Sequence, residues 1–583
     1  MPTLEWIGKD KVVNHHLDVP YRVLERQYSF DENGQHIGDT GSDNMIIHGD
    51  NLEALKSLLP QYEGRVKCIY IDPPYNTGNE GWVYNDNVND PRIRKWLGDV
   101  VGKEGEDLSR HDKWLCMMYP RLKLLQKLLS DDGVIFISID DTEYANLKLI
   151  CDEIFGSNCF VSNISWQRTY STRNDSKGIV NEVEHVIVYS KQPNWQPNKL
   201  PRTAEMNAKY KNPDNDVALW RPDNAYAPGA ATHQGMVYAI QHPFTGEYLY
   251  PSNGRCWTFG QEQMLEIMCG WCEYELRELD DAKQRAAICG VSERDIRQGV
   301  KAIVLAETLE ISSKKAQAVY DKGPWPRFFF SKGGKGGIAR KTYLDNVGGK
   351  LPTNFWPFSE TGHTDEAKKE MLAIFNGRAT FDTPKPCRLL EYVLTIAGDK
   401  ETLILDSFAG SGTTAHAVLS MNKADGGKRS FILIEMMDYA DSITTERVKR
   451  VIQGYGSGKN AVAGTGGNFS YYELGEPLMV GDVLNENVGV DKIREYVYFT
   501  DTKSRLPETH PDEPYYMGTH VNSAYYFYYE KQAVTTLNRE FLHTVKTKAD
   551  TYVIYADLCT LSDAELEKYH ITFKKIPRDI TKL

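Results

Sequence analysis

Residues 401–414 read Glu401-Thr-Leu-Ile-Leu-Asp406-Ser-Phe-Ala-Gly410-Ser-Gly412-Thr-Thr414. The apolar run before Asp406 predicts a buried strand, the glycines predict a tight turn, and Thr414 to Met421 has helical character. A strand, a glycine turn and a helix start together can cradle a nucleotide. The segment lacks the Gly-Lys-Ser/Thr of a phosphate-binding loop, and it is not the dinucleotide motif G-x-G-x-x-G because its third glycine is missing. It therefore predicts an α/β fold with a nucleotide-like ligand at this turn.

The next strand, Phe431-Ile-Leu-Ile434, ends at Glu435. An acid at the tip of that strand can bind both hydroxyls of a ribose. The same residues also fit a tight strand-to-helix connection that binds no ligand, because glycine-rich turns commonly connect secondary-structure elements. On this segment alone both interpretations stand.

A similar alternation precedes residue 76. Met45–His48 and Val66–Ile71 read as buried strands, and the apolar spacing over 51–59 predicts a helix between them. The second strand stops at Asp72-Pro-Pro-Tyr75, because two prolines forbid its continuation. This places Asp72 at the carboxyl end of a parallel strand, the edge at which open α/β sheets bind ligands.

The segment Asp72-Pro-Pro-Tyr75 has residue types suited to an aromatic amine. The Asp72 carboxylate and the Pro73 carbonyl can accept both N–H bonds of the amine, which would localise its lone pair on nitrogen. The prolines hold the loop in a fixed geometry. Tyr75 offers a ring face on which a flipped base can stack. A stiff turn without chemistry is the equally weighted alternative for these four residues.

Together the two segments resemble the amino-methyltransferases of DNA, in the adenine-modifying group whose catalytic motif precedes the cofactor motif. The modification subunits of Type III restriction-modification systems are the nearest likeness. The similarity covers about residues 40–190 and 340–455, and it is weaker over 191–340. It implies an α/β fold: a Rossmann-like S-adenosylmethionine-dependent methyltransferase core with permuted motif order, an inserted target-recognition domain, and a small C-terminal α/β domain.

The resemblance also implies roles for individual residues. The catalytic residues would be Asp72, Pro73, Pro74 and Tyr75. The segment Phe381-Asp-Thr-Pro-Lys-Pro386 resembles the one that lies over the methionine part of the cofactor, and the acid of His48-Gly-Asp50 resembles the one that reaches its adenine. Residues expected to bind the cofactor are Asp50, Lys385, Pro386, Asp406, Phe408, Ala409, Gly410, Ser411, Gly412, Thr413 and Glu435.

Four regions are expected along the chain. Residues 1–190 and 351–470 would form the two halves of the core, with a Gly-rich linker at 456–468. Residues 191–350, with a helical insert at about 272–322, would recognise the target. Residues 471–583 would be a separate domain for dimerisation or partner docking, and the aromatic cluster from Tyr515 to Tyr529 favours a core or an interface there. The long loop over 76–111 is expected to be functional or disordered.

Basic residues between the two motifs are candidates for DNA contact. Residues 242–257 predict a β-hairpin that presents Arg255, which could pair with guanine, contact phosphate or bind an internal carboxylate. Residues 305–320 fit either a helix-turn-helix with its recognition helix from Ser312 or a plain helical hairpin, and the former would turn Lys314 and Lys315 toward DNA. Phosphate contact or a solvated loop is expected for Lys332, Lys335, Arg340 and Lys341.

Composition excludes other classes. The 583 residues contain no apolar stretch of about 18 residues, and the first residues lack a signal-peptide pattern, so a cytoplasmic protein without a membrane segment is expected. The ten cysteines, with Cys269 and Cys272 as the only close pair, predict reduced thiols and no metal site. The net charge of −12 is unfavourable for DNA globally, so local basic surfaces would have to bind it.

The expected partners are double-stranded DNA, a second copy of the chain, and a translocase or nuclease subunit. No motif for nucleotide hydrolysis or DNA cleavage occurs in the chain itself. Three alternatives remain: a stand-alone adenine methyltransferase, a cytosine-N4 methyltransferase, and a subunit that serves chiefly to recognise DNA in a defence complex. The cytosine group usually has Ser in the place of Asp72 and often Trp in the place of Tyr75.

Overall fold

The computed structural model describes residues 3–38, 40–77, 110–170, 179–507 and 512–578. Most of the predicted loop over 76–111 lies outside these residues. Among the residues described, no helix combines the length and the apolar character that a membrane crossing requires.

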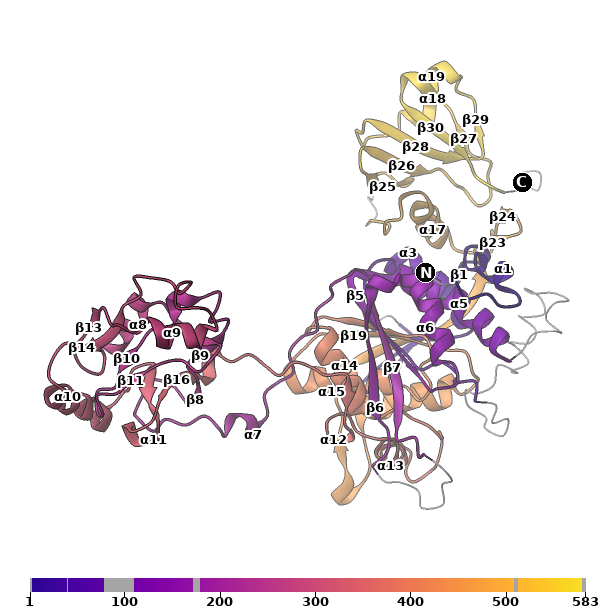
Figure 1. Cartoon of the computed structure of the whole chain (residues 1–583). Helices are drawn as coiled ribbons and strands as arrows, with labels where there is room; N and C mark the ends of the chain where they lie inside the picture. Colours follow the sequence, from indigo (N-terminus) through magenta and orange to yellow (C-terminus); the bar gives the residue numbers. More distant parts are fainter. Residues whose placement is uncertain (1–2, 39, 78–109, 171–178, 508–511, 579–583) are drawn as a thin grey trace. The chain divides into compact units, whose positions relative to one another are not determined.

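An eleven-stranded sheet organises the larger part of the chain (Figure 1). In spatial order its strands are β17 (Phe355–Trp356), β6 (Phe160–Gln167), β7 (Val183–Ser190), β5 (Leu129–Ile139), β4 (Val66–Ile71), β18 (Leu403–Asp406), β19 (Ser430–Glu435), β3 (Met45–His48), β22 (Asn468–Pro477), β1 (Arg22–Asp31) and β2 (Gly34–His36).

The permuted motif order is visible in the topology of this sheet. The run from β5 to β22 is parallel throughout. Within it, β18 and β19 from the C-terminal half of the chain lie between β4 and β3 from the N-terminal half. The central sheet and its helices confirm the predicted α/β fold class.

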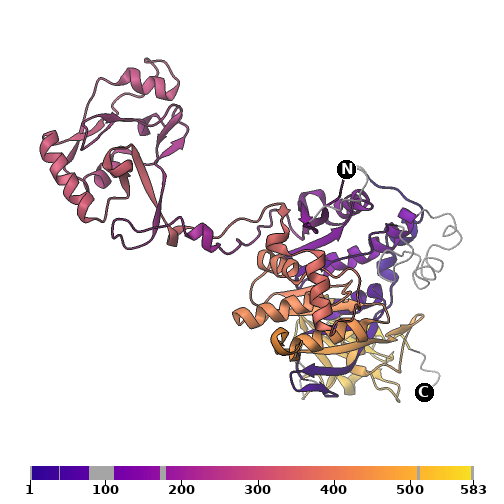
Figure 2. The same ribbon diagram turned by 90° about the horizontal axis from the view of Figure 1, so that it is seen from below.

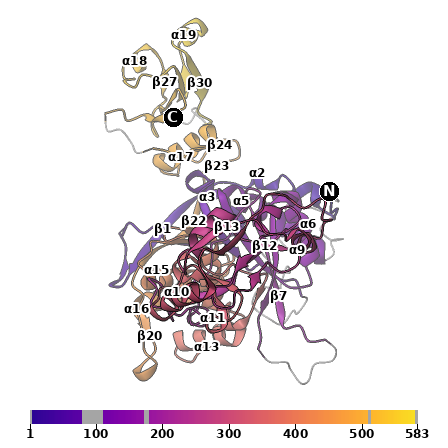
Figure 3. The ribbon, with the colours of Figure 1, turned by 60° about the vertical axis from the view of Figure 1, so that its left-hand side comes forward.

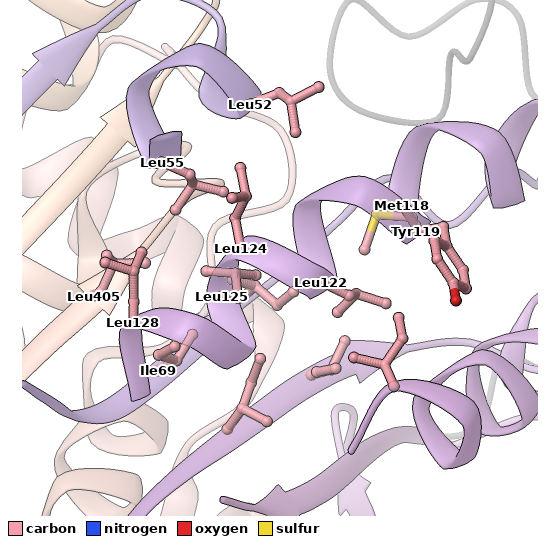
Figure 4. Close-up of a cluster of buried hydrophobic side chains, with 14 of the residues drawn as sticks. Leu52, Leu55, Ile69, Met118, Tyr119, Leu122, Leu124, Leu125, Leu128 and Leu405 are labelled. Atoms are coloured by element: carbon pink, nitrogen blue, oxygen red, sulfur yellow. The ribbon is translucent and has the colours of Figure 1, made fainter. Parts of the chain in front are cut away.

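Helices cover both faces of the parallel strands. On one face, α3 (Asn51–Tyr62), α5 (Arg110–Leu128) and α6 (Tyr144–Phe155) pack against alternate strand residues such as Ile69 and Leu405 (Figure 4). The residues between these, such as Cys68 and Ile404, are equally buried. They point to the opposite face of the sheet. On that face α14 (Cys387–Ala397) and α15 (Thr413–Asp425) contact the strands. Burial on both faces explains why the strands read as continuous apolar runs.

The predicted linker and the boundary at residue 471 are corrected by the structure. Residues 468–477 form β22, which pairs in parallel with β3 and antiparallel with β1, so a late strand lies beside the earliest ones (Figure 2; Figure 3). The glycines from 456 to 467 lie in and after the short hairpin of β20 (Gly454–Tyr455) and β21 (Val462–Ala463). The alternation Phe469, Tyr471 fits a sheet strand, and only the glycines before it indicated a linker.

Beyond β22, a smaller four-stranded sheet has the order β25 (Tyr516–His520), β26 (Ser523–Phe527), β28 (Thr551–Ala556) and β30 (Ile571–Lys575). The helices of this part are α17 (Val490–Thr502), α18 (Arg539–Leu542) and α19 (Asp563–Lys568). The aromatic cluster serves as core, because Tyr525 and Phe527 pack in one apolar cluster and Tyr526 in another.

Residues 199–351 form a compact unit of their own. The expected helical insert is wrong: this stretch contains β13 (Tyr274–Arg277), α9 (Ala282–Cys289), β14 (Ala302–Leu305) and α10 (Leu309–Lys322). β14 joins a mixed sheet with β13, β10 (Ile240–Gln241) and β11 (Tyr248–Leu249). Ala302-Ile-Val-Leu305 pairs with β13 as a strand and is buried along its whole length, so this apolar run belongs to a strand and not to a helix.

Candidate active site

The carboxyl ends of β4 and β18 meet at one edge of the sheet, since the two strands are parallel and pair at Ile69 and Leu405. β4 runs directly into Asp72, and β18 ends on Asp406. A single cavity reaches both ends and joins the two predicted motifs. Its lining includes Tyr70, Asp72, Phe381, Lys385, Asp406, Phe408, Ala409, Gly410, Ser411 and Thr413.

Asp72 lies in a tight hydrogen-bonded cluster. The Lys385 ammonium donates to Asp72 Oδ2 over 2.7 Å and to the Tyr75 hydroxyl oxygen over 3.0 Å. The Tyr75 hydroxyl donates to Asp72 Oδ1 over 2.9 Å. Lys385 thus directs its side chain to the loop of residues 72–75, while its backbone carbonyl accepts a 3.2 Å hydrogen bond from Thr413 Oγ1 of the glycine turn.

The loop that follows β4 is fixed by its own residues. Pro73 and Pro74 are buried, and the Pro74 carbonyl accepts a 2.7 Å hydrogen bond from the indole of Trp114, a fully buried residue of α5. Asn76 adopts a left-handed conformation with φ 60° and donates to the Arg110 carbonyl. Such anchoring holds Asp72 and Tyr75 in place before any ligand arrives.

Two further charged residues belong to the cluster, and the sequence interpretation missed both. Glu184 of β7, whose side chain is 8% exposed, has Oε2 at 3.2 Å from the Tyr75 hydroxyl, as the alternative acceptor of its single proton, and at 3.7 Å from the Lys385 ammonium. Arg168 donates to the other oxygen of Glu184 over 2.8 Å. A signal was present, because Glu184 interrupts an apolar strand, and buried acids are almost always paired.

The charged groups in this cluster shift one another's pKa values. Burial raises the pKa of the Asp72 carboxyl, and Lys385 opposes that rise. Burial acts in the same direction on Glu184, but Lys385 and Arg168 outweigh it and hold the pKa of Glu184 below its usual value. The pKa of Lys385 is raised, since the attraction of Asp72 and Glu184 outweighs burial. Two carboxylates therefore face two cations.

The glycine turn presents its backbone to the same cavity. Gly410 and Gly412 have positive φ angles of 52° and 78°. A Cβ at Gly412 would lie 2.9 Å from the Thr444 carbonyl oxygen, so no larger residue fits there without a shift. Ala409 is buried, with its N–H bonded to the Ile434 carbonyl, and α15 begins at Thr413.

Burial raises the pKa values of the two acids at the ends of β18 and β19. Asp406 accepts from Thr414 Oγ1 over 2.6 Å and from the Phe408 N–H over 3.1 Å, and burial raises its pKa to about 7. Glu435 accepts from the N–H groups of Gly410 and Met437, and burial raises its pKa to about 7. Both acids can therefore change their charge near neutral pH.

Asp50 and Pro386 occupy helix starts. Asp50 caps α3 by accepting from the N–H groups of Leu52 and Glu53, and Pro386 precedes the first residue of α14. The neighbouring Asn51 bridges two parts of the site, because its amide donates to the Ser407 carbonyl and accepts a 2.6 Å hydrogen bond from Arg121. This bridge was not foreseen.

Arg447 supports the glycine turn through hydrogen bonds to two of its hydroxyl groups. Its fully buried guanidinium donates to Ser411 Oγ over 3.0 Å, to Thr413 Oγ1 over 2.7 Å and to Glu370 over 2.8 Å. The hydroxyls of Ser411 and Thr413 are thus oriented by the protein.

Comparison with known proteins agrees with this geometry. A family model described as DNA methylase matches residues 66–264 and 296–446, a span that contains both Asp72 and the glycine turn. The chain belongs to this DNA methylase family.

The chain has relatives of two kinds. It is 33% identical over 70% of its length to the Type III restriction-modification enzyme StyLTI Mod subunit of Salmonella typhimurium, and 27% identical over 74% to the EcoPI Mod subunit of Escherichia phage P1. The aligned regions span 57% and 63% of those two relatives. The Type II methyltransferase M.KpnI of Klebsiella pneumoniae is 29% identical over 68% of the chain and is itself covered to 81%.

The residues predicted to contact DNA lie in the unit of residues 199–351. The predicted hairpin forms between β10 and β11, but Arg255 begins β12 (Arg255–Trp257), which pairs with β9 (Tyr226–Pro228) instead. Arg255 is exposed, as are Lys332 and Lys335 in the connection from β15 (Phe328–Phe330) to β16 (Ile338–Tyr343).

The helix-turn-helix and the plain helical hairpin are both wrong for residues 305–320. Residues 306–308 connect β14, which ends at Leu305, to α10, so the apolar spacing crossed a strand-to-helix boundary and no helix precedes α10 directly. Lys314 pairs with Glu310 and Lys315 with Glu307, each over 2.7 Å. Arg340 lies 3.6 Å from Asp223.

The prediction that Lys341 contacts phosphate or lies in a solvated loop is wrong, because its side chain is wholly buried and pairs with Asp214 and Asp216. A lysine with no exposed side-chain surface has no access to a phosphate. It follows the exposed glycine segment by a few residues, and on β16 its side chain faces the core of the unit.

Proposed function

We propose that the chain transfers a methyl group from S-adenosylmethionine to the N6 amine of an adenine flipped out of double-stranded DNA. The observation that carries this proposal is the placement of Asp72, on its proline-fixed loop, at the same cavity that the glycine turn lines. Two motifs that are individually ambiguous thus share one site.

The residues present fit such a cofactor. Phe408 offers an aromatic ring, Asp406 and Glu435 offer carboxylates, and the glycine turn allows close approach. The Ser407 hydroxyl is buried without a hydrogen-bond partner among the described residues, so the turn offers a ligand one unsatisfied hydrogen-bonding group. Asp50, Lys385 and Pro386 flank this turn in the proposed binding set. When bound, the cofactor supplies an electrophilic methyl group.

The catalytic loop provides what the amine needs. The lone pair of an adenine amine is delocalised into its ring, so the amine is a poor nucleophile. Asp72 and the Pro73 carbonyl accept its two N–H bonds, which localises the lone pair on nitrogen at the moment charge develops there. The Tyr75 ring stacks on the flipped base, whose removal from the helix costs a few kcal/mol.

Adenine is favoured over cytosine by the identity of the loop. Asp72 and Tyr75 stand where the cytosine-N4 group usually has Ser and often Trp. We expect DNA from cells that express the protein to contain N6-methyladenine and no added N4-methylcytosine. Mass analysis of digested nucleosides measures both, and a rise in N4-methylcytosine alone would overturn the assignment.

The biological setting we propose is a restriction-modification system of the Type III kind, with a translocase or nuclease subunit as partner and a second copy of the chain. The two Mod-subunit relatives support this setting. A stand-alone enzyme is the second candidate, supported by the broader coverage of M.KpnI. Single-molecule sequencing separates them: an asymmetric site methylated on one strand fits the first, and a palindrome methylated on both strands fits the second.

Glu435 gives cofactor binding a predicted pH dependence. Its pKa of about 7 means that the carboxylate, the form that accepts ribose hydroxyls, is lost as the pH falls below 7. We expect S-adenosylmethionine to bind more tightly at pH 8 than at pH 6. Glu435→Gln should weaken binding at pH 8 by about 10-fold, the value of one charged hydrogen bond, and flatten the pH dependence. Calorimetric titration checks this, with the exposed Glu401→Gln as the matched control. An unchanged pH slope in Glu435→Gln would contradict it.

A further inference from the structure

Lys385 occupies the place where a target amine would have to bind. Its ammonium lies 2.7 Å from Asp72 Oδ2 and 3.0 Å from the Tyr75 hydroxyl oxygen, while Tyr75 itself donates to Asp72 Oδ1. Both oxygens of the catalytic carboxylate therefore already have donors. Under the proposed function, on which this inference rests, an adenine amine must displace one of them.

The charge of Lys385 makes it the donor that has to leave. As the amine attacks the methyl group, its nitrogen gains positive charge, and an ammonium on the same carboxylate would compete for that carboxylate and oppose the charge. The Tyr75 hydroxyl also donates to that carboxylate, but it is neutral and does not oppose the charge. A fixed Lys385–Asp72 pair would thus work against the reaction that Asp72 serves.

A second acceptor for the ammonium lies within reach. Glu184 Oε2 is 3.7 Å from Lys385 Nζ, so a small rotation of the lysine side chain suffices to bring them into contact. Glu184 is held in place by Arg168, and the Trp166 ring lies 6.0 Å from the ammonium. The two carboxylates belong to different strands: Asp72 follows β4, and Glu184 lies on β7. The lysine side chain lies between them.

We propose that Lys385 is a movable counterion, which pairs with Asp72 while the base pocket is empty and passes to Glu184 when the target amine binds Asp72. Lys385 and Glu184 are positioning residues in this scheme, since each acts through Asp72. The transfer moves an ammonium between two carboxylates and requires no change in protonation. Arg168 remains on Glu184, so the four-charge cluster stays neutral throughout.

The scheme makes the two residues interdependent. Without Glu184 the ammonium has one carboxylate left, and it stays on Asp72. Without Lys385 the buried carboxylate loses its cation, so the pKa of Asp72 rises further and the ionised form is reached only at higher pH. Removal of both residues takes away the blocking cation together with a repelling anion, and Asp72 is free to bind the amine.

The test compares Glu184→Gln, Lys385→Met and the double variant on a duplex that carries the mapped target site. Glu184→Gln should lower kcat/KM by about 10-fold or more, chiefly through the KM for DNA, while affinity for S-adenosylmethionine is kept. Lys385→Met should shift the pH profile of kcat/KM to higher pH. The double variant should exceed Glu184→Gln at pH 8 by about fivefold, a coupling that independent residues lack.

Binding without turnover gives a second readout. The wild type should prefer a duplex with adenine at the target position over one with unsubstituted purine there, because only adenine offers the amine. Glu184→Gln should lose this preference, and the double variant should regain it. The control Glu182→Gln makes the same chemical change two residues away and should behave as the wild type.

Two results would overturn the counterion scheme: a Glu184→Gln variant with wild-type KM and base preference, or a double variant whose loss equals the product of the single losses. A melting temperature within a few degrees of the wild type in each variant shows that folding is retained. The proposed function fails differently, namely by the absence of methylated adenine from DNA treated with the wild type.

Discussion

Asp72→Ala should abolish methyl transfer and leave binding of S-adenosylmethionine nearly unchanged. The carboxylate is the charged acceptor of the target amine, and loss of one preorganised electrostatic partner in an active site lowers kcat by about 100- to 1,000-fold. The glycine turn follows β18 and Glu435 lies on β19, so the backbone that holds them does not depend on Asp72, although the Lys385 side chain loses its hydrogen bond to Asp72. Incorporation of labelled methyl groups into DNA and calorimetric titration of the cofactor measure the two effects.

The matched control for this variant is Asp131→Ala, an exposed acid at the start of β5. It should retain activity within about twofold, as expected for a surface substitution. Near-full activity of Asp72→Ala would refute the catalytic role of the loop. Equal loss of transfer and of cofactor binding would instead assign Asp72 to the cofactor.

Lys341→Met should destabilise the unit of residues 199–351 by about 3–5 kcal/mol, because it leaves two buried carboxylates without their cation. The lysine pairs with Asp214 and, over 2.5 Å, with Asp216, and it donates to the Trp325 carbonyl. Asp214 in turn accepts from the Trp220 indole over 2.8 Å. Urea unfolding of the full chain, followed by tryptophan fluorescence, should show an earlier transition.

Lys332→Met is the matched control, since it removes an exposed lysine from the same segment and should change the unfolding free energy by less than about 0.5 kcal/mol. The opposite pattern, with unchanged unfolding of Lys341→Met and a shallower salt dependence of its DNA binding, would restore the phosphate contact that the sequence suggested for Lys341.

Local patterns predicted the parts of the site that are contiguous in sequence. The prolines after Ile71 and the glycines after Asp406 define their own conformations, so the loop of residues 72–75 and the glycine turn lie where the sequence predicts them. The catalytic role of that loop stays a prediction. The apolar run of β4 likewise identified a buried strand.

The rest depended on contacts between distant segments. Glu184 lies on β7 and meets Lys385 only because the sheet and α14 bring them together. Lys341 has the sequence context of an exposed basic loop, yet strand pairing with β8 (Trp220–Asn224) directs it inward. Residues 468–477 follow a run of glycines, and their place in the main sheet is decided by pairing with β3 and β1. Charge and glycine content alone carry no information on such pairings.

The interleaving of β18 and β19 between β4 and β3 has a consequence for how the chain folds. During synthesis, β3 and β4 emerge more than 300 residues before the two strands that must fill the space between them. Closing such long loops makes folding slow, and unpaired strand edges in the meantime are prone to aggregation. The nascent N-terminal half therefore carries an incomplete sheet that a late segment completes. A chain cut within residues 199–351 would yield two fragments, each of which needs the other to complete the main sheet.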